Sequence, residues 1–192
     1  MSPRNPPAVD RLAGDAAALV KTVTPHDWPH GFAVVPERLP RGLVALACGT
    51  GTGIAELYRL RRGVRAVLVD AWKIVTDVSK PTARDVWRFE STTLHEAAHA
   101  LLAPPADAET VDGLLATAAE DVAAYPADKV ARQHGPLWAA AFWWMATRAA
   151  GFRPRTGAAM VASVATELEI YGYRRADLER LATPADTSLR AA

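Results

Sequence analysis

Cysteine is almost absent from this sequence, which has a single one, Cys48, among its 192 residues. One cysteine excludes an intramolecular disulfide and also excludes a four-cysteine zinc ribbon. An excess of one charge is missing too, because 22 lysines and arginines against 21 aspartates and glutamates leave a formal net charge of +1. This balance gives no reason to expect nucleic acid or an anionic membrane surface as a partner.

Long apolar runs are also lacking. The longest lies near residues 139–146 and is far too short to span a bilayer. The first seven residues are polar and rich in proline, unlike the cationic start and apolar stretch of a signal peptide. We therefore expect a cytoplasmic protein with no membrane partner, and the sequence leaves its oligomeric state open.

Half of the residues are hydrophobic, which is enough for a sizeable core in a chain of this length. We expect one domain over residues 10–182, with a disordered lead at 1–9 and a flexible tail at 183–192. The apolar patterns predict strands at 32–35, 43–48 and 64–69. They predict helices at 10–21, from about 85 or 91 to 103, and at 107–125, 136–150, 157–170 and 174–182. This order favours an α+β fold with a small, mostly antiparallel sheet followed by a helical bundle.

The most specific pattern is His95-Glu96-Ala97-Ala98-His99, an H-E-x-x-H sequence in a segment that should be helical. Residues four apart lie on the same face of a helix, so His95 and His99 can bind one zinc ion. Glu96 lies one step round the helix and can reach a water molecule bound to that metal. The spacing predicts Zn²⁺ as the cofactor, two histidine ligands, and Glu96 as the general base.

A hydrolytic zinc site needs a third protein ligand. A metzincin would have a histidine six residues after His99, but that position is Pro105. A gluzincin would use an acidic residue on a later helix, and Glu120 is at a suitable distance along the chain. The apolar face of the predicted 107–125 helix puts Glu120 on the solvent side and Asp121 nearer the boundary. Both acids are therefore less favoured candidates.

The favoured third ligand is His134, which precedes the helix predicted at 136–150. Extending that helix backwards places His134 on the same side as four apolar residues. These are Leu137, Trp138, Ala141 and Met145. That face should pack towards the H-E-x-x-H helix, whereas Trp143 points away from it and is a candidate exposed contact. A lone loop histidine is usually solvated, but a two-histidine site that needs a partner favours His134 as a ligand.

The H-E-x-x-H sequence and the downstream His134-Gly135-Pro136-Leu137-Trp138 together resemble the SprT-like zincin metallopeptidases and related bacterial proteins of unassigned role. In that group a histidine in an H-G-x-x-aromatic sequence completes the zinc site. The resemblance covers about residues 92–150 and implies His95, His99 and His134 as ligands and Glu96 as general base. It also implies a zincin-like domain that hydrolyses peptide bonds in a peptide or protein substrate.

The chain departs from the DNA-repair members of that group in two respects. It has no cysteine ribbon after the catalytic domain, and it has no strong basic excess. A role in DNA–protein crosslink repair is therefore not carried over. A domain that binds zinc for a structural or regulatory purpose, and cleaves nothing, is the main alternative to a peptidase.

A competing pattern lies at residues 43–51, where a predicted strand runs into a glycine-rich turn. It looks like the first motif of S-adenosylmethionine-dependent methyltransferases, and Asp70 stands where those enzymes hold the ribose hydroxyls. However, Ala45 occupies the position that usually carries an acid, and no convincing strand follows Val75. We favour a glycine-rich connection between antiparallel strands.

Overall fold

The computed structural model describes residues 5–49, 58–61, 63–102 and 134–180 of the chain. The elements are α1 (Pro7–Val23), β1 (Phe32–Pro36), β2 (Ala45–Gly49), β3 (Arg65–Val69), α3 (Ala71–Ile74), α4 (Ala83–Leu102), α7 (Pro136–Gly151) and α8 (Gly157–Ile170). A further helical segment covers 175–180. The predicted helix at 107–125 and the predicted tail at 183–192 lie outside the described residues. The fold is α+β, as predicted.

The three strands form one sheet in the order β1-β3-β2. β2 is antiparallel to β3, but β1 is parallel to β3, so the expectation of a mostly antiparallel sheet is correct for only one of the two pairings. The reason is the path of the chain. β2 runs back to the end where β1 began, and β3 then enters between the two strands. Within the described part of the chain, β2 is therefore an edge strand of this sheet.

β3 is the central strand, and its residues from Ala66 to Val69 are all fully buried. Side chains alternate between the two faces of a strand, so β3 contributes to two cores. Val67 and Val69 join the main core with the helices, whereas Leu68 joins a smaller cluster with Leu39. A strand that is buried on both faces reads as a continuous apolar run in the sequence.

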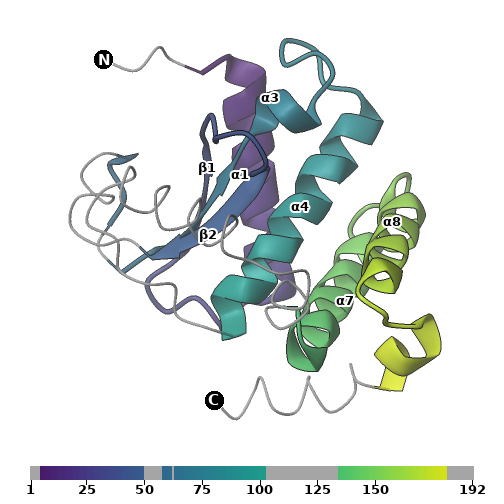
Figure 1. Cartoon of the computed structure of the whole chain (residues 1–192). Helices are drawn as coiled ribbons and strands as arrows, with labels where there is room; N and C mark the ends of the chain where they lie inside the picture. The colour runs from purple at the N-terminus through teal and green to yellow at the C-terminus, as the bar shows by residue number, and fades with distance from the viewer. Residues whose placement is uncertain (1–4, 50–57, 62, 103–133, 181–192) are drawn as a thin grey trace.

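α4 is the central helix, and it lies between the sheet and the α7–α8 pair (Figure 1). On one side it packs against α1, β2 and β3, and on the other against α7 and α8. Its sequence is Ala/Leu-rich around the H-E-x-x-H motif, and Ala97, Ala98 and Ala100 are fully buried. Small side chains let the neighbouring elements approach the backbone of the motif closely.

Among the helices in the described part of the chain, none has both the length and the apolar character that crossing a bilayer requires.

α1 begins at Pro7, three residues before the predicted start at residue 10. Proline is well suited to the first helical position, because its fixed φ matches the helix and the N–H it lacks would have no helical partner. Val9 is fully buried and so belongs to the core. Asp10 therefore lies in the first turn of the helix.

α7 begins at Pro136, as the sequence predicts, but two of its side chains lie differently from the expectation. Leu137 is 65% exposed and does not face inwards, whereas Trp143 is only 3% exposed. The guanidinium carbon of Arg175 lies 5.9 Å from the centre of the Trp143 ring. α7 is apolar on nearly all sides, which is typical of a buried helix. Its sequence pattern therefore does not indicate which face meets solvent.

A capping box formed by Thr82 and Asp85 lies at the start of α4, and the carboxylate of Asp85 makes the free energy of unfolding depend on pH. The Thr82 hydroxyl donates to Asp85 Oδ2 at 2.7 Å, the Thr82 N–H donates to the same oxygen at 2.9 Å, and the Asp85 N–H donates to the Thr82 hydroxyl at 3.2 Å. These bonds from Thr82 lower the pKa of Asp85 to about 2. A carboxyl whose pKa is lower in the folded than in the unfolded protein stabilises the fold at pH values above its unfolded pKa of about 3.9. This stabilisation is lost as the pH falls through the folded pKa.

The substitution Asp85→Asn should therefore cost about 1–2 kcal/mol of unfolding free energy at pH 7 and much less near pH 2. Urea unfolding of both proteins at the two pH values measures the difference. A chelator should be present throughout, so that release of metal in acid does not contribute. An equal cost at both pH values would contradict the role of the Asp85 charge.

Candidate metal centre

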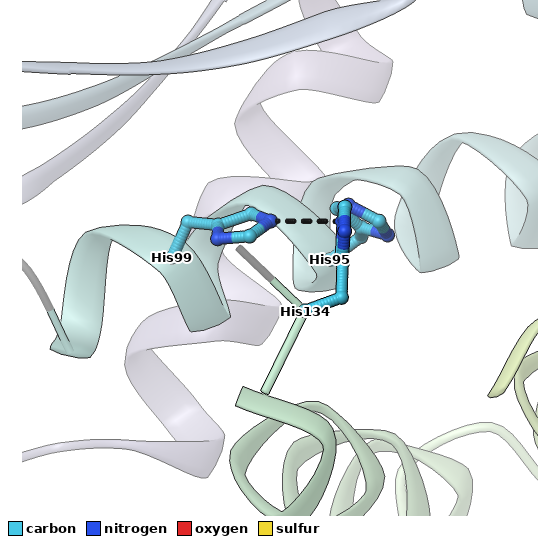
Figure 2. Close-up of side chains that lie close together, drawn as sticks. All are labelled: His95, His99 and His134. Carbon is cyan, nitrogen blue, oxygen red and sulfur yellow. Dashed lines mark hydrogen bonds between the residues drawn. The ribbon is translucent and has the colours of Figure 1, made fainter. Parts of the chain in front are cut away.

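The three histidines that the sequence singles out meet at one point (Figure 2). His95 and His99 project from one face of α4, as their spacing of four residues requires, and His134 enters from the residues just before α7. The Nε2 atom of His134 lies 3.1 Å from Nε2 of His95 and 3.3 Å from Nε2 of His99. One nitrogen from each ring lies within 4.8 Å of the other two, so the group can hold a metal ion.

The indole of Trp138 packs against all three imidazoles and is itself only 2% exposed. It stacks on His99 with ring centres 5.3 Å apart, and it meets His95 and His134 edge to face at 4.8 and 4.3 Å. Its Nε1–H also donates to the backbone carbonyl of His95 at 3.3 Å. Trp138 therefore limits the rotation of the rings whose nitrogens converge.

His134 is buried and is held by two tyrosines that follow α8. The ring of Tyr171 stacks on it with centres 4.2 Å apart and an angle of 20° between the planes. The Tyr173 hydroxyl donates to the His134 carbonyl at 2.8 Å. His134 is thereby held in place by residues that follow α8.

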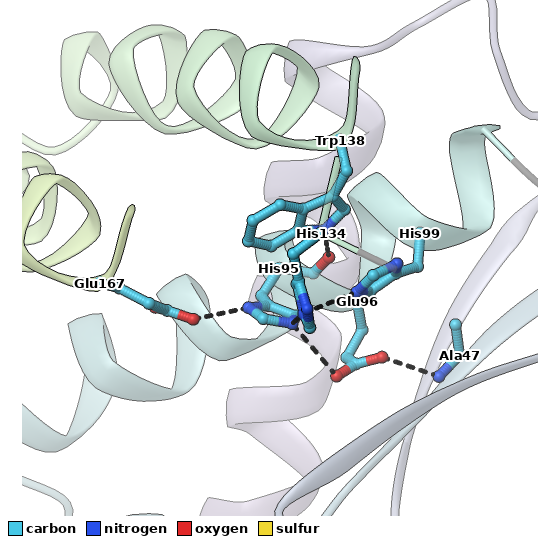
Figure 3. Close-up of polar contacts among 7 residues, drawn as sticks. All are labelled: Ala47, His95, Glu96, His99, His134, Trp138 and Glu167. Carbon is cyan, nitrogen blue, oxygen red and sulfur yellow. Dashed lines mark hydrogen bonds and ion pairs between the residues drawn. The ribbon is translucent and has the colours of Figure 1, made fainter. Parts of the chain in front are cut away.

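Glu96 points from α4 towards both the histidines and the sheet (Figure 3). Its Oε2 accepts a hydrogen bond of 3.0 Å from the backbone N–H of Ala47 in the edge strand β2. Its Oε1 lies 3.9 Å from Nε2 of His95. One carboxylate oxygen is thus anchored to the sheet, and the other is directed to the point where the histidines meet.

The far nitrogen of His95 has a carboxylate partner that the sequence did not reveal. Nδ1 of His95 lies 2.6 Å from Oε1 of Glu167, which projects from α8 (Figure 3). An imidazole that donates its Nδ1–H to a carboxylate keeps the lone pair of Nε2 free for a metal ion.

The protonation of the group follows from burial and from these contacts. Burial lowers the pKa of His95, but the hydrogen bond to Glu167 and the charges of Glu96 and Glu167 outweigh that effect and raise it. Burial, and then the charges of His95 and His134, lower the pKa of His99 to about 3, so His99 is neutral at pH 7. Burial raises the pKa of Glu96, against the lowering effects of His95 and of the Ala47 N–H.

The structure thus brings together His95, Glu96, His99 and His134, and it adds Glu167, which only the packing of α8 reveals. The alternative ligands Glu120 and Asp121 lie outside the described residues. Asp70, considered above for a ribose, accepts the Leu39 N–H at 2.9 Å and lies 3.2 Å from the ammonium of Lys73. Its carboxylate therefore fixes the loop between β1 and β2.

No protein-family model, curated protein or solved structure matches this chain. The function is therefore inferred from the chemistry of the metal centre.

Proposed function

We propose that this protein is a zinc-dependent metallopeptidase in which His95, His99 and His134 bind Zn²⁺ and Glu96 is the general base. The observation that carries the proposal is the convergence of three imidazole nitrogens beside one oxygen of Glu96. Three histidines with a water molecule in the fourth position are a known ligand set of catalytic zinc.

The separation of the nitrogen atoms is compatible with zinc, the metal that we propose. Zinc binds imidazole nitrogen at about 2.0–2.1 Å with tetrahedral angles, which puts two ligand nitrogens about 3.3 Å apart. The separations from His134 Nε2 to the other two Nε2 atoms are 3.1 and 3.3 Å. Neutral imidazole, moreover, is a ligand that suits zinc.

Zinc that keeps one open position acidifies a bound water molecule and polarises a substrate carbonyl. Oε2 of Glu96 already accepts the Ala47 N–H, so Oε1 is the oxygen that would accept the proton of this water molecule. The same oxygen can then deliver that proton to the leaving amine.

The position of β2 supports a peptide as the substrate. β2 is an edge strand of the sheet, and Glu96 hydrogen-bonds to its residue Ala47. Extended peptides bind such edges by adding a strand, with main-chain hydrogen bonds to the edge. Because Glu96 already accepts the Ala47 N–H, a peptide bound along β2 would pair with the other main-chain groups of this edge and would pass beside Glu96.

Metal removal tests the proposal directly. The purified protein should contain about one zinc ion per chain. It should cleave an unfolded protein such as reduced casein, lose this activity in 1,10-phenanthroline, and regain it with added zinc. Elemental analysis and mass spectrometry of the products measure both parts. Stoichiometric zinc without cleavage of casein or of a mixed peptide library would instead support the structural or regulatory alternative.

A further inference from the structure

Glu167 lies on α8, far along the chain from the H-E-x-x-H helix, yet it makes the shortest side-chain contact with a histidine of the centre that is seen among the described residues. Its Oε1 is 2.6 Å from Nδ1 of His95, across a separation of 72 residues. The His95 side chain is 14% exposed and the Glu167 side chain 34%. A hydrogen bond to an ionised carboxylate is short and is roughly twice as strong as one between neutral groups.

The contact is on the side of the imidazole away from the metal. Nδ1 faces Glu167, whereas Nε2 faces the other two histidines at the point of convergence. Glu167 therefore acts through His95, by fixing both the tautomer and the orientation of the ring. A rotation that turned Nδ1 towards the metal would break the bond to Glu167.

The packing of α8 keeps the carboxylate in this position. Gly157 begins the helix, and a Cβ atom there would lie 2.5 Å from the carbonyl oxygen of Ala150, so the absence of a side chain lets α8 approach α7 closely. Val164 and Leu168, on either side of Glu167, are fully buried. Tyr171, four residues after Glu167, stacks on His134, so the end of α8 contacts two of the three histidines.

We propose that Glu167 is a positioning residue that sets the metal affinity of the centre by holding His95 in its binding orientation. This inference rests on the metal-binding part of the proposed function and does not depend on hydrolysis. It assigns to α8 the task of orienting a ligand that lies on α4.

The test compares the zinc affinity of the full-length protein with that of Glu167→Ala, Glu167→Gln and the control Glu169→Ala. Glu169 lies two residues further along α8 and is exposed. Competition with a chelator of known affinity gives the dissociation constants. We expect Glu167→Ala to bind zinc about 10- to 100-fold more weakly. Glu167→Gln should fall between it and the wild type, because the amide oxygen still accepts the Nδ1–H, and Glu169→Ala should match the wild type.

Two further measurements separate positioning from the other possible roles of Glu167. With cobalt bound in place of zinc, the absorption spectrum reports the metal's ligands, and the spectrum of Glu167→Ala should match that of the wild type. Its unfolding in chelator shows whether the metal-free fold is intact. Unchanged zinc affinity in Glu167→Ala, with or without a lower melting temperature, would overturn the proposal. Complete loss of zinc would also overturn it, because Glu167 would then be a ligand. Zinc binding without peptidase activity in the wild type would contradict the proposed function and leave this comparison valid.

Discussion

Replacing Glu96 with glutamine should leave zinc bound and lower kcat for peptide hydrolysis by about 10²- to 10⁴-fold, the usual contribution of a general base. Glutamine has the size of glutamate, and its amide oxygen can still accept the N–H of Ala47, so the side chain should stay in place. An amide cannot take up a proton at neutral pH. The loss should therefore appear in kcat rather than in metal content.

Steady-state kinetics and elemental analysis on the same preparation of Glu96→Gln give both quantities. Glu169→Gln is a suitable control, because Glu169 is an exposed glutamate outside the centre and should keep full activity. Hydrolysis at the wild-type rate in Glu96→Gln would contradict the assignment of the base. Loss of zinc in this variant would show that Glu96 supports the metal, contrary to its assigned role.

The substitution His134→Ala should remove tight zinc binding, because two histidines remain where three are needed. Zinc that binds only the folded protein stabilises it by about 4 kcal/mol when free zinc is 1,000 times the dissociation constant. The melting temperature of the wild type should therefore rise with zinc, and that of His134→Ala should not. His134 is also packed against Tyr171, so each variant is compared with its own value in chelator.

Two control variants make this result specific to the third ligand. His30→Ala removes an exposed histidine in the loop before β1, outside the centre, and should leave the response to zinc unchanged. Glu120→Ala addresses the gluzincin alternative, in which an acid on a later helix completes the site. Loss of zinc in Glu120→Ala, with retention in His134→Ala, would move the third ligand to Glu120.

The sequence predicted those parts of the centre that depend on local geometry. His95 and His99 share a face because the helix repeats every 3.6 residues, and this holds whatever surrounds the helix. The position of His134 followed from a helix start at Pro136, which the structure confirms. The strands were also recognisable, because each is a short apolar run bounded by turn signals.

The contacts of Glu167 and Ala47 could not be predicted, because they join segments that are 72 and 49 residues apart. Nothing in the local pattern around either residue specifies which element will pack against it. The burial of Trp143 and the exposure of Leu137 were missed for a different reason. A helix that is apolar all round gives no contrast from which to choose a face. The parallel β1–β3 pairing depends on strand order, which alternation along single strands does not encode.

The distance along the chain between His95 and Glu167 also has a consequence for biosynthesis. The ribosome makes α4 first, so the H-E-x-x-H pair emerges well before the residue that orients one of its rings. Chains grow at about 5–20 residues per second, and the 72 intervening residues therefore delay the complete centre by several seconds. During that interval a nascent chain has His95, Glu96 and His99 but lacks the support of α8. If the centre binds zinc as proposed, we expect tight binding only after the C-terminal helices have been synthesised and packed.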